Sequence, residues 1–199
     1  MNICIFGDSI TWGAVDHDKG GWAERLKTYF MEHQEGVNLY NLGVDDNTSD
    51  DLLKRFDVEA SAREAALIVF AIGTNDSQYI KTTDNPRVSL EKFENNIFEL
   101  VKQAKKFTNK ILFVSPTRVD ESKTMPIPWD TVRYYDNENI KKYSDLLKKF
   151  CNEERLTYVD IQNLLDTEDL YDGLHPFPQG HQKIFEIMKE AVKKLQTNS

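Results

Sequence analysis

Short apolar runs alternate along the chain with stretches that carry apolar residues at helical spacing. Five such runs lie at residues 2–6, 37–42, 67–72, 110–114 and 156–161. Within two of them, the stretches LIVFAI and ILFV are apolar at every position. Strands that are apolar on both faces are typical of a parallel sheet covered by helices on both sides. The pattern therefore predicts a five-stranded parallel sheet.

Four of the intervening stretches have an apolar stripe with the period of an α-helix. The stripes consist of Trp22, Leu26, Tyr29 and Phe30; Phe93, Ile97, Leu100, Val101 and Ala104; Ile140, Tyr143, Leu147 and Phe150; and Ile184, Ile187, Met188, Ala191 and Leu195. We interpret all four as faces that pack on the core. Strands that alternate with helices predict right-handed βαβ units and a three-layer α/β/α sandwich.

The length of 199 residues suits a single domain, and we expect one domain over 1–199. The longest irregular segment is 115–136, which contains Trp129, Tyr134 and Tyr135. A loop of that length in a compact domain is usually functional. Our hypothesis is that these aromatic side chains wall a substrate pocket.

Charge and composition exclude several classes of partner. The net charge of −8 disfavours nucleic acid and anionic membranes, because like charges repel. No apolar run approaches the ~20 residues of a membrane-spanning helix, so membrane insertion is not expected. The first residues lack the pattern of a signal peptide, which predicts a cytoplasmic location. Cys4 and Cys151 belong to no metal-binding or redox motif and are expected to be reduced.

Polar residues with catalytic chemistry follow four of the five predicted strands. The segments are GDSIT with Ser9, NLGV with Gly43, GTND with Asn75, and DGLHP with Asp172 and His175. In an open parallel sheet, ligands bind at the carboxyl ends of the strands. The fold prediction alone therefore brings these segments to one edge of the sheet.

Each segment has a use in acyl transfer. A serine hydroxyl becomes a good nucleophile when a neighbouring base takes its proton, and His175 is the candidate base for Ser9. Asp172, three residues earlier, is placed to orient the imidazole. The backbone N–H groups of Ser9 and Gly43 and the amide of Asn75 are candidate oxyanion donors. Each motif alone has an ordinary structural explanation as a turn or a cap, and their ordered combination is what favours catalysis.

GDSIT, NLG, GTND and DGLHP, in this order, resemble the four signature blocks of the SGNH hydrolases, also called GDSL lipases and acylhydrolases. The resemblance extends from Gly7 to His175. It implies a flavodoxin-like fold and ester hydrolysis through an acyl-enzyme, without a metal or cofactor. It also implies that Ser9 is the nucleophile, His175 the base and Asp172 its orienting partner. Ser9, Gly43 and Asn75 would donate to the oxyanion.

Several charged residues besides the proposed catalytic ones also bear on the site. Related sequences often carry a glycine where Asp46 stands, and an aspartate there would change the loop conformation or place negative charge near the pocket. We interpret Asp8 and Asp76 as acceptors that brace loops. Arg118 and Arg133 are candidates for holding an anionic substrate group, although solvated loop charges are commoner.

The sequence predicts a serine esterase for small or medium acyl esters. A thioesterase or lysophospholipase needs the same residues and a longer acyl groove. A phospho-receiver module shares the fold class, but the acidic signature that it needs fits GDSIT and GTND poorly. A flavin-binding module of the same fold class would colour the purified protein yellow. A non-catalytic binding protein on the same scaffold is the remaining alternative. The oligomeric state is not specified by the sequence.

Overall fold

A computed structural model of the protein describes residues 1–197, so the last two residues of the predicted domain lie outside the described part. Its central sheet has five strands: β1 (Asn2–Gly7), β2 (Asn38–Gly43), β3 (Leu67–Ala71), β5 (Ile111–Val114) and β7 (Thr157–Val159). Their order is β2-β1-β3-β5-β7, and all neighbours are parallel. The predicted parallel sheet is confirmed, and this order is the flavodoxin-like one.

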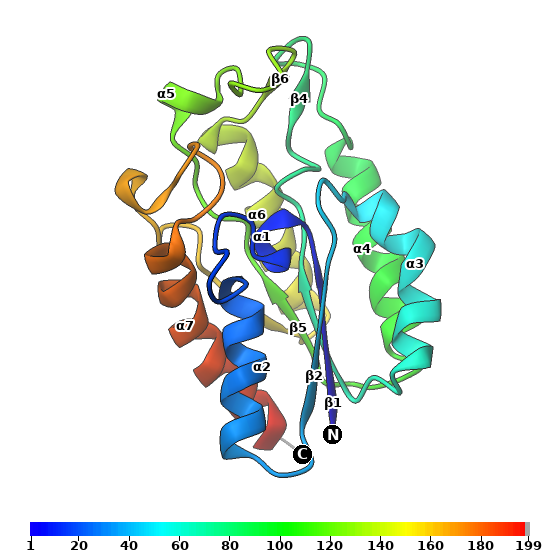
Figure 1. Ribbon diagram of the computed structural model, residues 1–199. Helices are drawn as coiled ribbons and strands as arrows, with labels where there is room; N and C mark the ends of the chain where they lie inside the picture. Colours follow the sequence, from blue (N-terminus) through cyan, green and yellow to red (C-terminus); the bar gives the residue numbers. More distant parts are fainter. Residues whose placement is uncertain (198–199) are drawn as a thin grey trace.

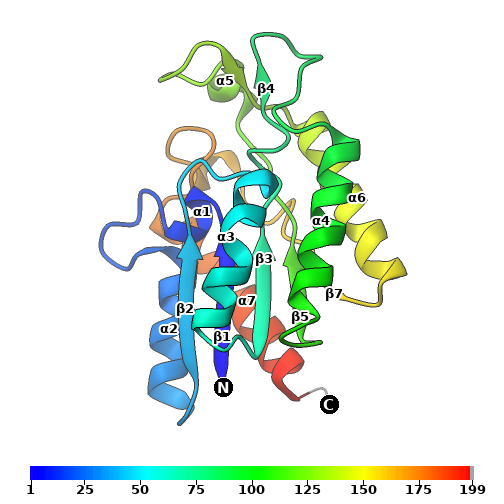
Figure 2. The same ribbon diagram turned by 90° about the vertical axis from the view of Figure 1, so that its right-hand side faces the viewer.

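Helices cover both faces of the sheet, which gives three layers (Figures 1 and 2). On one face lie α2 (Gly21–His33) and α7 (Pro178–Thr197). On the other lie α3 (Ser49–Ala62), α4 (Leu90–Ala104) and α6 (Asn137–Glu153). The predicted α/β/α sandwich is therefore confirmed.

Alternate residues of the central strands enter two separate cores. Phe6, Phe70 and Phe113 pack with α3, α4 and α6, whereas Ile5 and Val69 point to the opposite core beneath α2 and α7. This alternation follows from the pleat of a strand, which sends successive side chains to opposite faces. The sheet is thus buried on both sides, as its continuous apolar runs indicate.

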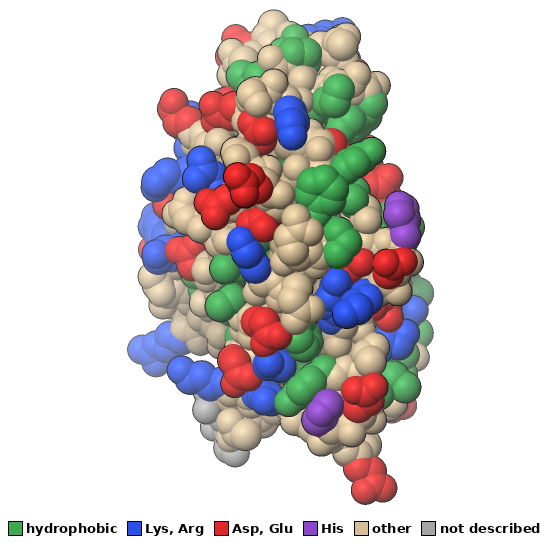
Figure 3. Space-filling model, turned by 60° about the vertical axis from the view of Figure 1, so that its left-hand side comes forward, with side chains coloured by type: hydrophobic (Ala, Val, Ile, Leu, Met, Phe, Trp, Pro, Cys, Tyr) green, Lys and Arg blue, Asp and Glu red, His purple; other side chains and the backbone are tan. Residues whose placement is uncertain are grey.

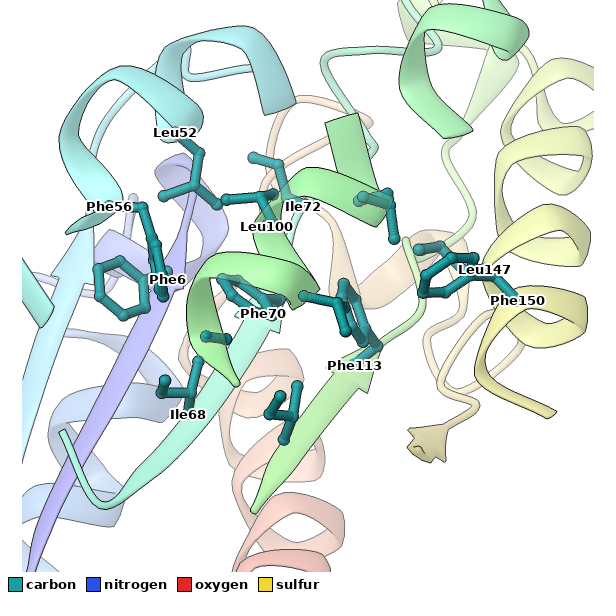
Figure 4. Close-up of a cluster of buried hydrophobic side chains, with 14 of the residues drawn as sticks. Phe6, Leu52, Phe56, Ile68, Phe70, Ile72, Leu100, Phe113, Leu147 and Phe150 are labelled. Carbon is teal, nitrogen blue, oxygen red and sulfur yellow. The ribbon is translucent and has the colours of Figure 1, made fainter. Parts of the chain in front are cut away.

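Phenylalanine rings dominate the core on the α3 and α4 side (Figure 4). The centroid of Phe56 lies 4.9 Å from that of Phe6 and 5.3 Å from that of Phe70. Phe70 in turn lies 5.0 Å from Phe113. These tilted pairs join three strands to α3 and hold the sheet at the level where its carboxyl ends begin.

The predicted stripes are buried or partly buried, with one exposed exception. Ile187 on α7 is 42% exposed, because it lies on the solvent side of a helix whose core contacts come from Ile184, Met188 and Leu195. Helix α3 has no counterpart among the predicted stripes. Its core contacts rest mainly on Leu52, Phe56 and Ala60, and the residues between them are largely polar or charged.

The segment 115–136 contains short elements that its sequence does not predict. It includes α5 (Glu121–Thr124) and β6 (Arg133–Tyr134), and β6 pairs antiparallel with β4 (Tyr79–Ile80). Elements of two to four residues are too short to show a hydrophobic period. Figures 1 and 2 show α5, β4 and β6 beyond the carboxyl ends of the sheet. We call residues 115–136 the cap segment.

The surface carries charges of both signs. Figure 3 shows one face on which acidic and basic side chains are interspersed, with apolar side chains gathered between them. Among residues 1–197, no helix combines the length and the apolar character that crossing a membrane requires.

The phenylalanine core gives a test of the packing. We expect Phe56→Ala to lower the free energy of unfolding by about 3–5 kcal/mol, because it leaves a cavity among three fully buried rings. Phe98→Ala on α4 removes the same ring from a side chain that is 52% exposed, and should cost about 0.5 kcal/mol. Urea unfolding measures both, and equal costs would contradict the assignment of the core.

Candidate active site

Ser9 is separated from the end of β1 by Asp8 alone, and it is the first residue of the short helix α1 (Ser9–Trp12). Its side chain is nearly buried. The carboxylate of Asp8 caps α1 by accepting the backbone N–H of Ile10 at 3.0 Å. This cap ends the strand abruptly and fixes the serine at the carboxyl edge of the sheet.

The structure brings Ser9, His175 and Asp172 into one hydrogen-bonded chain. Ser9 Oγ lies 2.9 Å from His175 Nε2, and His175 Nδ1 lies 2.7 Å from Asp172 Oδ2. Because the carboxylate has no proton to donate, Nδ1 carries the hydrogen and Nε2 is left as an acceptor. The Ser9 hydroxyl therefore donates to a nitrogen that can take its proton.

The loop that carries the histidine is held in shape by Asp172. Its Oδ1 accepts the backbone N–H of Leu174 at 2.9 Å and that of His175 at 2.8 Å. Gly173 has a φ of 90°, a value at which only glycine is unstrained. Because each carboxylate oxygen has a separate task, the aspartate fixes both the loop and the ring.

The electrostatics keep Asp172 ionised. Burial raises the pKa of this carboxyl. The hydrogen bond and charge of His175, together with two backbone N–H groups, lower the pKa by more than burial raises it. The net effect is a pKa below the ordinary value of an aspartate. An ionised carboxylate at this place stabilises the positive imidazole that forms when the histidine takes a proton.

A cavity of about 160 Å³ opens beside Ser9. Its walls are Ser9, Asp45, Asp46, Asn75, Gln78, Ile127, Trp129, Arg133, Tyr135, Leu174 and His175. Trp129 also stacks near the ring of His175, with centroids 6.0 Å apart and planes 28° from parallel. Trp129 and Tyr135 come from the cap segment, which agrees with the hypothesis that its aromatic residues wall a pocket. Tyr134 is not among these wall residues.

Asn75 lines the cavity, and both ends of its amide are held by hydrogen bonds. Its Oδ1 accepts the hydroxyl of Tyr135 at 2.7 Å, and its Nδ2 donates to the carbonyl of Asn47 at 3.0 Å. An amide nitrogen has two hydrogens, so one remains for a ligand in the cavity. The sequence did not identify Tyr135 as the group that orients this amide. Burial raises the pKa of Tyr135, which keeps its hydroxyl protonated as a donor.

The structure corrects the expectation for Gly43. Its backbone N–H donates to Asn41 Oδ1 at 3.0 Å, and within the described residues it is not part of the cavity wall. A Cβ at this position would lie 2.2 Å from the backbone nitrogen of Trp12. The glycine is therefore explained by the close approach of β2 to α1, and not by a role as an oxyanion donor.

Asp46 occupies the place in the cavity wall that we expected for Gly43. Its φ of 59° lies in the left-handed region, which costs an ordinary residue roughly 1–2 kcal/mol and which aspartate tolerates better than most. A glycine would adopt this conformation without strain. Within residues 1–197, the backbone N–H of Asp46 has no hydrogen-bond partner.

Asp8 and Asp76 accept hydrogen bonds from neighbouring backbone, as their interpretation as bracing residues predicts. Asp76 binds the hydroxyl and the backbone N–H of Ser49, the latter at 3.0 and 3.1 Å, and so fixes the start of α3. Both carboxyls are buried. Burial raises the pKa of Asp8 to about 6 and that of Asp76 to about 7.

The other residues considered from sequence lie apart from the cavity. Arg118 is exposed and lines a separate surface hollow beside Asn137 and Gln162. Cys4 and Cys151 are buried free thiols. Within residues 1–197, no group of three or more His, Cys, Asp or Glu side chains is arranged to hold a metal ion.

A comparison with family models decides the family. The model of the GDSL-like lipase/acylhydrolase family matches residues 5–183. The chain belongs to this family. The predicted resemblance to the SGNH hydrolases is thereby confirmed, and family membership makes this GDSL-like protein a carboxylic ester hydrolase.

Two relatives of this chain are named as esterases. An isoamyl acetate-hydrolyzing esterase of Saccharomyces cerevisiae is 28% identical, over 97% of this chain and 85% of that protein. An acetylxylan esterase of Geobacillus stearothermophilus is 23% identical, over 90% of this chain and 88% of that protein. The solved structure of that enzyme superposes with a TM-score of 0.75, over 99% of this chain and 94% of that one, at 18% identity.

The fold is shared with further solved structures. A lipase/acylhydrolase from Enterococcus faecalis superposes with a TM-score of 0.78 at 21% identity, over 97% of this chain and 95% of that chain. Catalytic mutants of the Geobacillus enzyme have been solved with a serine, an aspartate and a histidine replaced by alanine.

The buried carboxyls beside the site predict a dependence of stability on pH. Asp76 has a folded-state pKa of about 7, raised chiefly by burial, so between its unfolded value and 7 the folded state binds more protons than the unfolded state. Stability therefore falls as pH rises through this window, by at most about 1.4 kcal/mol per pH unit for one group. Asp76→Asn is expected to flatten this slope.

Urea unfolding at a series of pH values measures the slope. Asp57→Asn is the matched control, because it removes an exposed carboxylate from α3, and it should leave the slope unchanged. An identical slope in the parent and in Asp76→Asn would contradict the raised pKa.

Proposed function

We propose that this GDSL-like hydrolase is a serine esterase for short acyl esters, with Ser9 as nucleophile, His175 as base and Asp172 as its orienting carboxylate. The observation that carries the proposal is the pair of contacts at 2.9 and 2.7 Å that join the three side chains beside a cavity. The Geobacillus relative, for which serine, aspartate and histidine catalytic mutants exist, supports it.

The reaction proceeds in two halves. Ser9 Oγ bonds to the carbonyl carbon of the ester while His175 Nε2 takes the hydroxyl proton, which gives a tetrahedral anion. The bond to the alcohol then breaks, and His175 returns the proton to the leaving oxygen. Water attacks the resulting acyl-enzyme with the same base, and release of the acid restores the serine. Proton transfer of this kind contributes about 10²–10⁴ in rate.

Three donors are available for the anionic oxygen. They are the backbone N–H of Ser9, the remaining amide hydrogen of Asn75, and the backbone N–H of Asp46 in place of that of Gly43. The side chain of Asn75 bonds to the carbonyl of Asn47, so its amide lies beside the Asp46 loop. Loss of one such donor typically lowers the rate by about 10²–10³.

The cavity favours a short acyl group. The cavity is small, about 160 Å³, and this size favours an acetyl or propionyl ester over one with a long acyl chain. Ile127, Leu174 and Trp129 supply apolar wall for the small chain. The Saccharomyces relative is named for the hydrolysis of an acetate ester, which agrees with this size. A thioesterase or lysophospholipase for long chains needs a longer groove.

The remaining sequence expectations stay predictions. The acidic net charge argues against a nucleic-acid partner, and the buried free thiols of Cys4 and Cys151 fit the expected cytoplasmic location. The assembled serine, histidine and aspartate argue against a non-catalytic binding module, which has no need of their alignment.

Removal of the nucleophile tests the proposal directly. Ser9→Ala is expected to keep the fold and to lower kcat for p-nitrophenyl acetate by more than about 10⁴-fold. Ser122→Ala is the matched control, since this exposed hydroxyl of the cap segment bonds, within residues 1–197, only to Asp120. Circular dichroism checks the fold, and turnover by Ser9→Ala at the parental rate would exclude the proposed nucleophile.

A series of p-nitrophenyl esters from acetyl to palmitoyl tests the substrate class. We expect kcat/KM to be highest for acetyl or propionyl and at least about tenfold lower for octanoyl, because one or two misplaced methylenes already cost this much. Trp129→Ala removes part of the wall and should shift the optimum to longer chains. A preference for palmitoyl esters, or for acyl-CoA over oxygen esters, would favour a lysophospholipase or a thioesterase instead.

A further inference from the structure

Two features of Asp46 are unfavourable for the proposed role of its backbone N–H as a donor to the oxyanion. It holds a left-handed conformation with a φ of 59° although it is not glycine. Asp46 also lines the cavity in which a negative oxygen would form, so its carboxylate brings a negative charge close to that oxygen. Without compensation, its loop would relax to an ordinary conformation, and its charge would repel the oxyanion.

Two arginines hold Asp46 in this state. Arg87 donates through one nitrogen to Asp46 Oδ1 at 2.6 Å, and through the other to Asp46 Oδ2 and to its backbone carbonyl, both at 3.0 Å. Arg133 on β6 donates to Oδ1 at 3.0 Å. The guanidinium fork of Arg87 thus grips the side chain and the main chain of one residue together.

Arg87 is itself anchored outside the cavity. It lies in the turn between β4 and α4, where its backbone N–H donates to the carbonyl of Gln78 at 2.7 Å. Its side chain is about one-fifth exposed and, within the described residues, does not line the cavity. Arg133 does line the cavity and also pairs with Asp130. Arg87 also donates to Oε1 of the wall residue Gln78 at 3.5 Å, but its shorter side-chain contacts are all with Asp46. Arg87 is therefore the arginine whose side chain acts on the reaction chiefly through Asp46.

We propose that Arg87, assisted by Arg133, is a positioning residue that fixes the backbone N–H of Asp46 toward the oxyanion and offsets the charge of its carboxylate. This inference rests on the proposed esterase function. It explains how the chain keeps an aspartate in a backbone conformation that favours glycine. A glycine adopts this conformation unaided and carries no charge, so it would not need the arginine.

The test is a cycle of variants assayed with p-nitrophenyl acetate. Arg87→Ala is expected to lower kcat about tenfold with KM changed less than threefold, because the lost interaction acts on the transition state. Arg87→Lys retains the positive charge but cannot donate through two nitrogens, so its kcat should lie between those of the parent and of Arg87→Ala. In an Asp46→Gly background, whatever its own rate, Arg87→Ala should change kcat less than twofold. Arg118→Ala, which removes an exposed arginine outside the cavity, is the control and should match the parent.

A second measurement separates positioning from a general loss of structure. Methylboronic acid binds a reactive serine as a tetrahedral anion, so its inhibition constant should rise about tenfold in Arg87→Ala and less than twofold when Asp46→Gly is also present. The midpoint of thermal unfolding is recorded for every variant. If Arg87→Ala does not fold, Arg87→Lys takes its place in both backgrounds.

The outcomes distinguish this inference from the proposed function. An active parent whose kcat is unchanged by Arg87→Ala, or reduced equally with aspartate and glycine at position 46, would overturn the positioning role and leave the esterase proposal standing. A parent without ester turnover would overturn the proposed function, and the positioning role with it.

Discussion

The hydrogen bond between Ser9 and His175 is the contact on which the rest of the site depends. The two residues are 166 positions apart, so only the folded chain joins them. The serine is delivered by the abrupt end of β1, and the histidine by a loop near the last helix. A parallel sheet makes this meeting possible, because the carboxyl ends of all its strands lie along one edge. The two hydrophobic cores that clamp the sheet thereby also fix the distance between these side chains.

Three polar groups of the site are each fixed by further hydrogen bonds. Asp172 binds the backbone of its own loop, Tyr135 binds the amide of Asn75, and Arg87 binds Asp46. Donors that are fixed before the substrate arrives need no reorganisation when charge develops, which is the main source of electrostatic catalysis. The buried carboxyls of Asp8 and Asp76 differ from these groups, because burial disfavours their ionised forms. This destabilisation accompanies the hydrogen bonds by which the two side chains brace the loops.

The sheet and the meeting of the three catalytic candidates could be predicted from local periodicity and from the motifs that follow the strands. Each predicted strand lies within two residues of the observed bounds, and Ser9, Asp172 and His175 meet as expected. The pattern did not reveal which residue of NLGVDDNTS faces the cavity, since a backbone N–H has no sequence signature of its own. Tyr135 and Arg87 act through contacts across 60 and 41 positions, and no local pattern encodes such contacts. The capping box of Thr48 and Asp51 is a readable signal that marks the start of α3.

The most direct measurement is the site of covalent labelling by a fluorophosphonate, a reagent that reacts with a serine only when a base activates it and donors stabilise the adduct. The labelled protein is digested and its peptides are sequenced by mass spectrometry. The proposed chemistry predicts one adduct per chain, on Ser9, with none on the exposed Ser122. Absence of an adduct under conditions that label a known serine hydrolase, or an adduct on another residue, would contradict the claim that His175 activates Ser9.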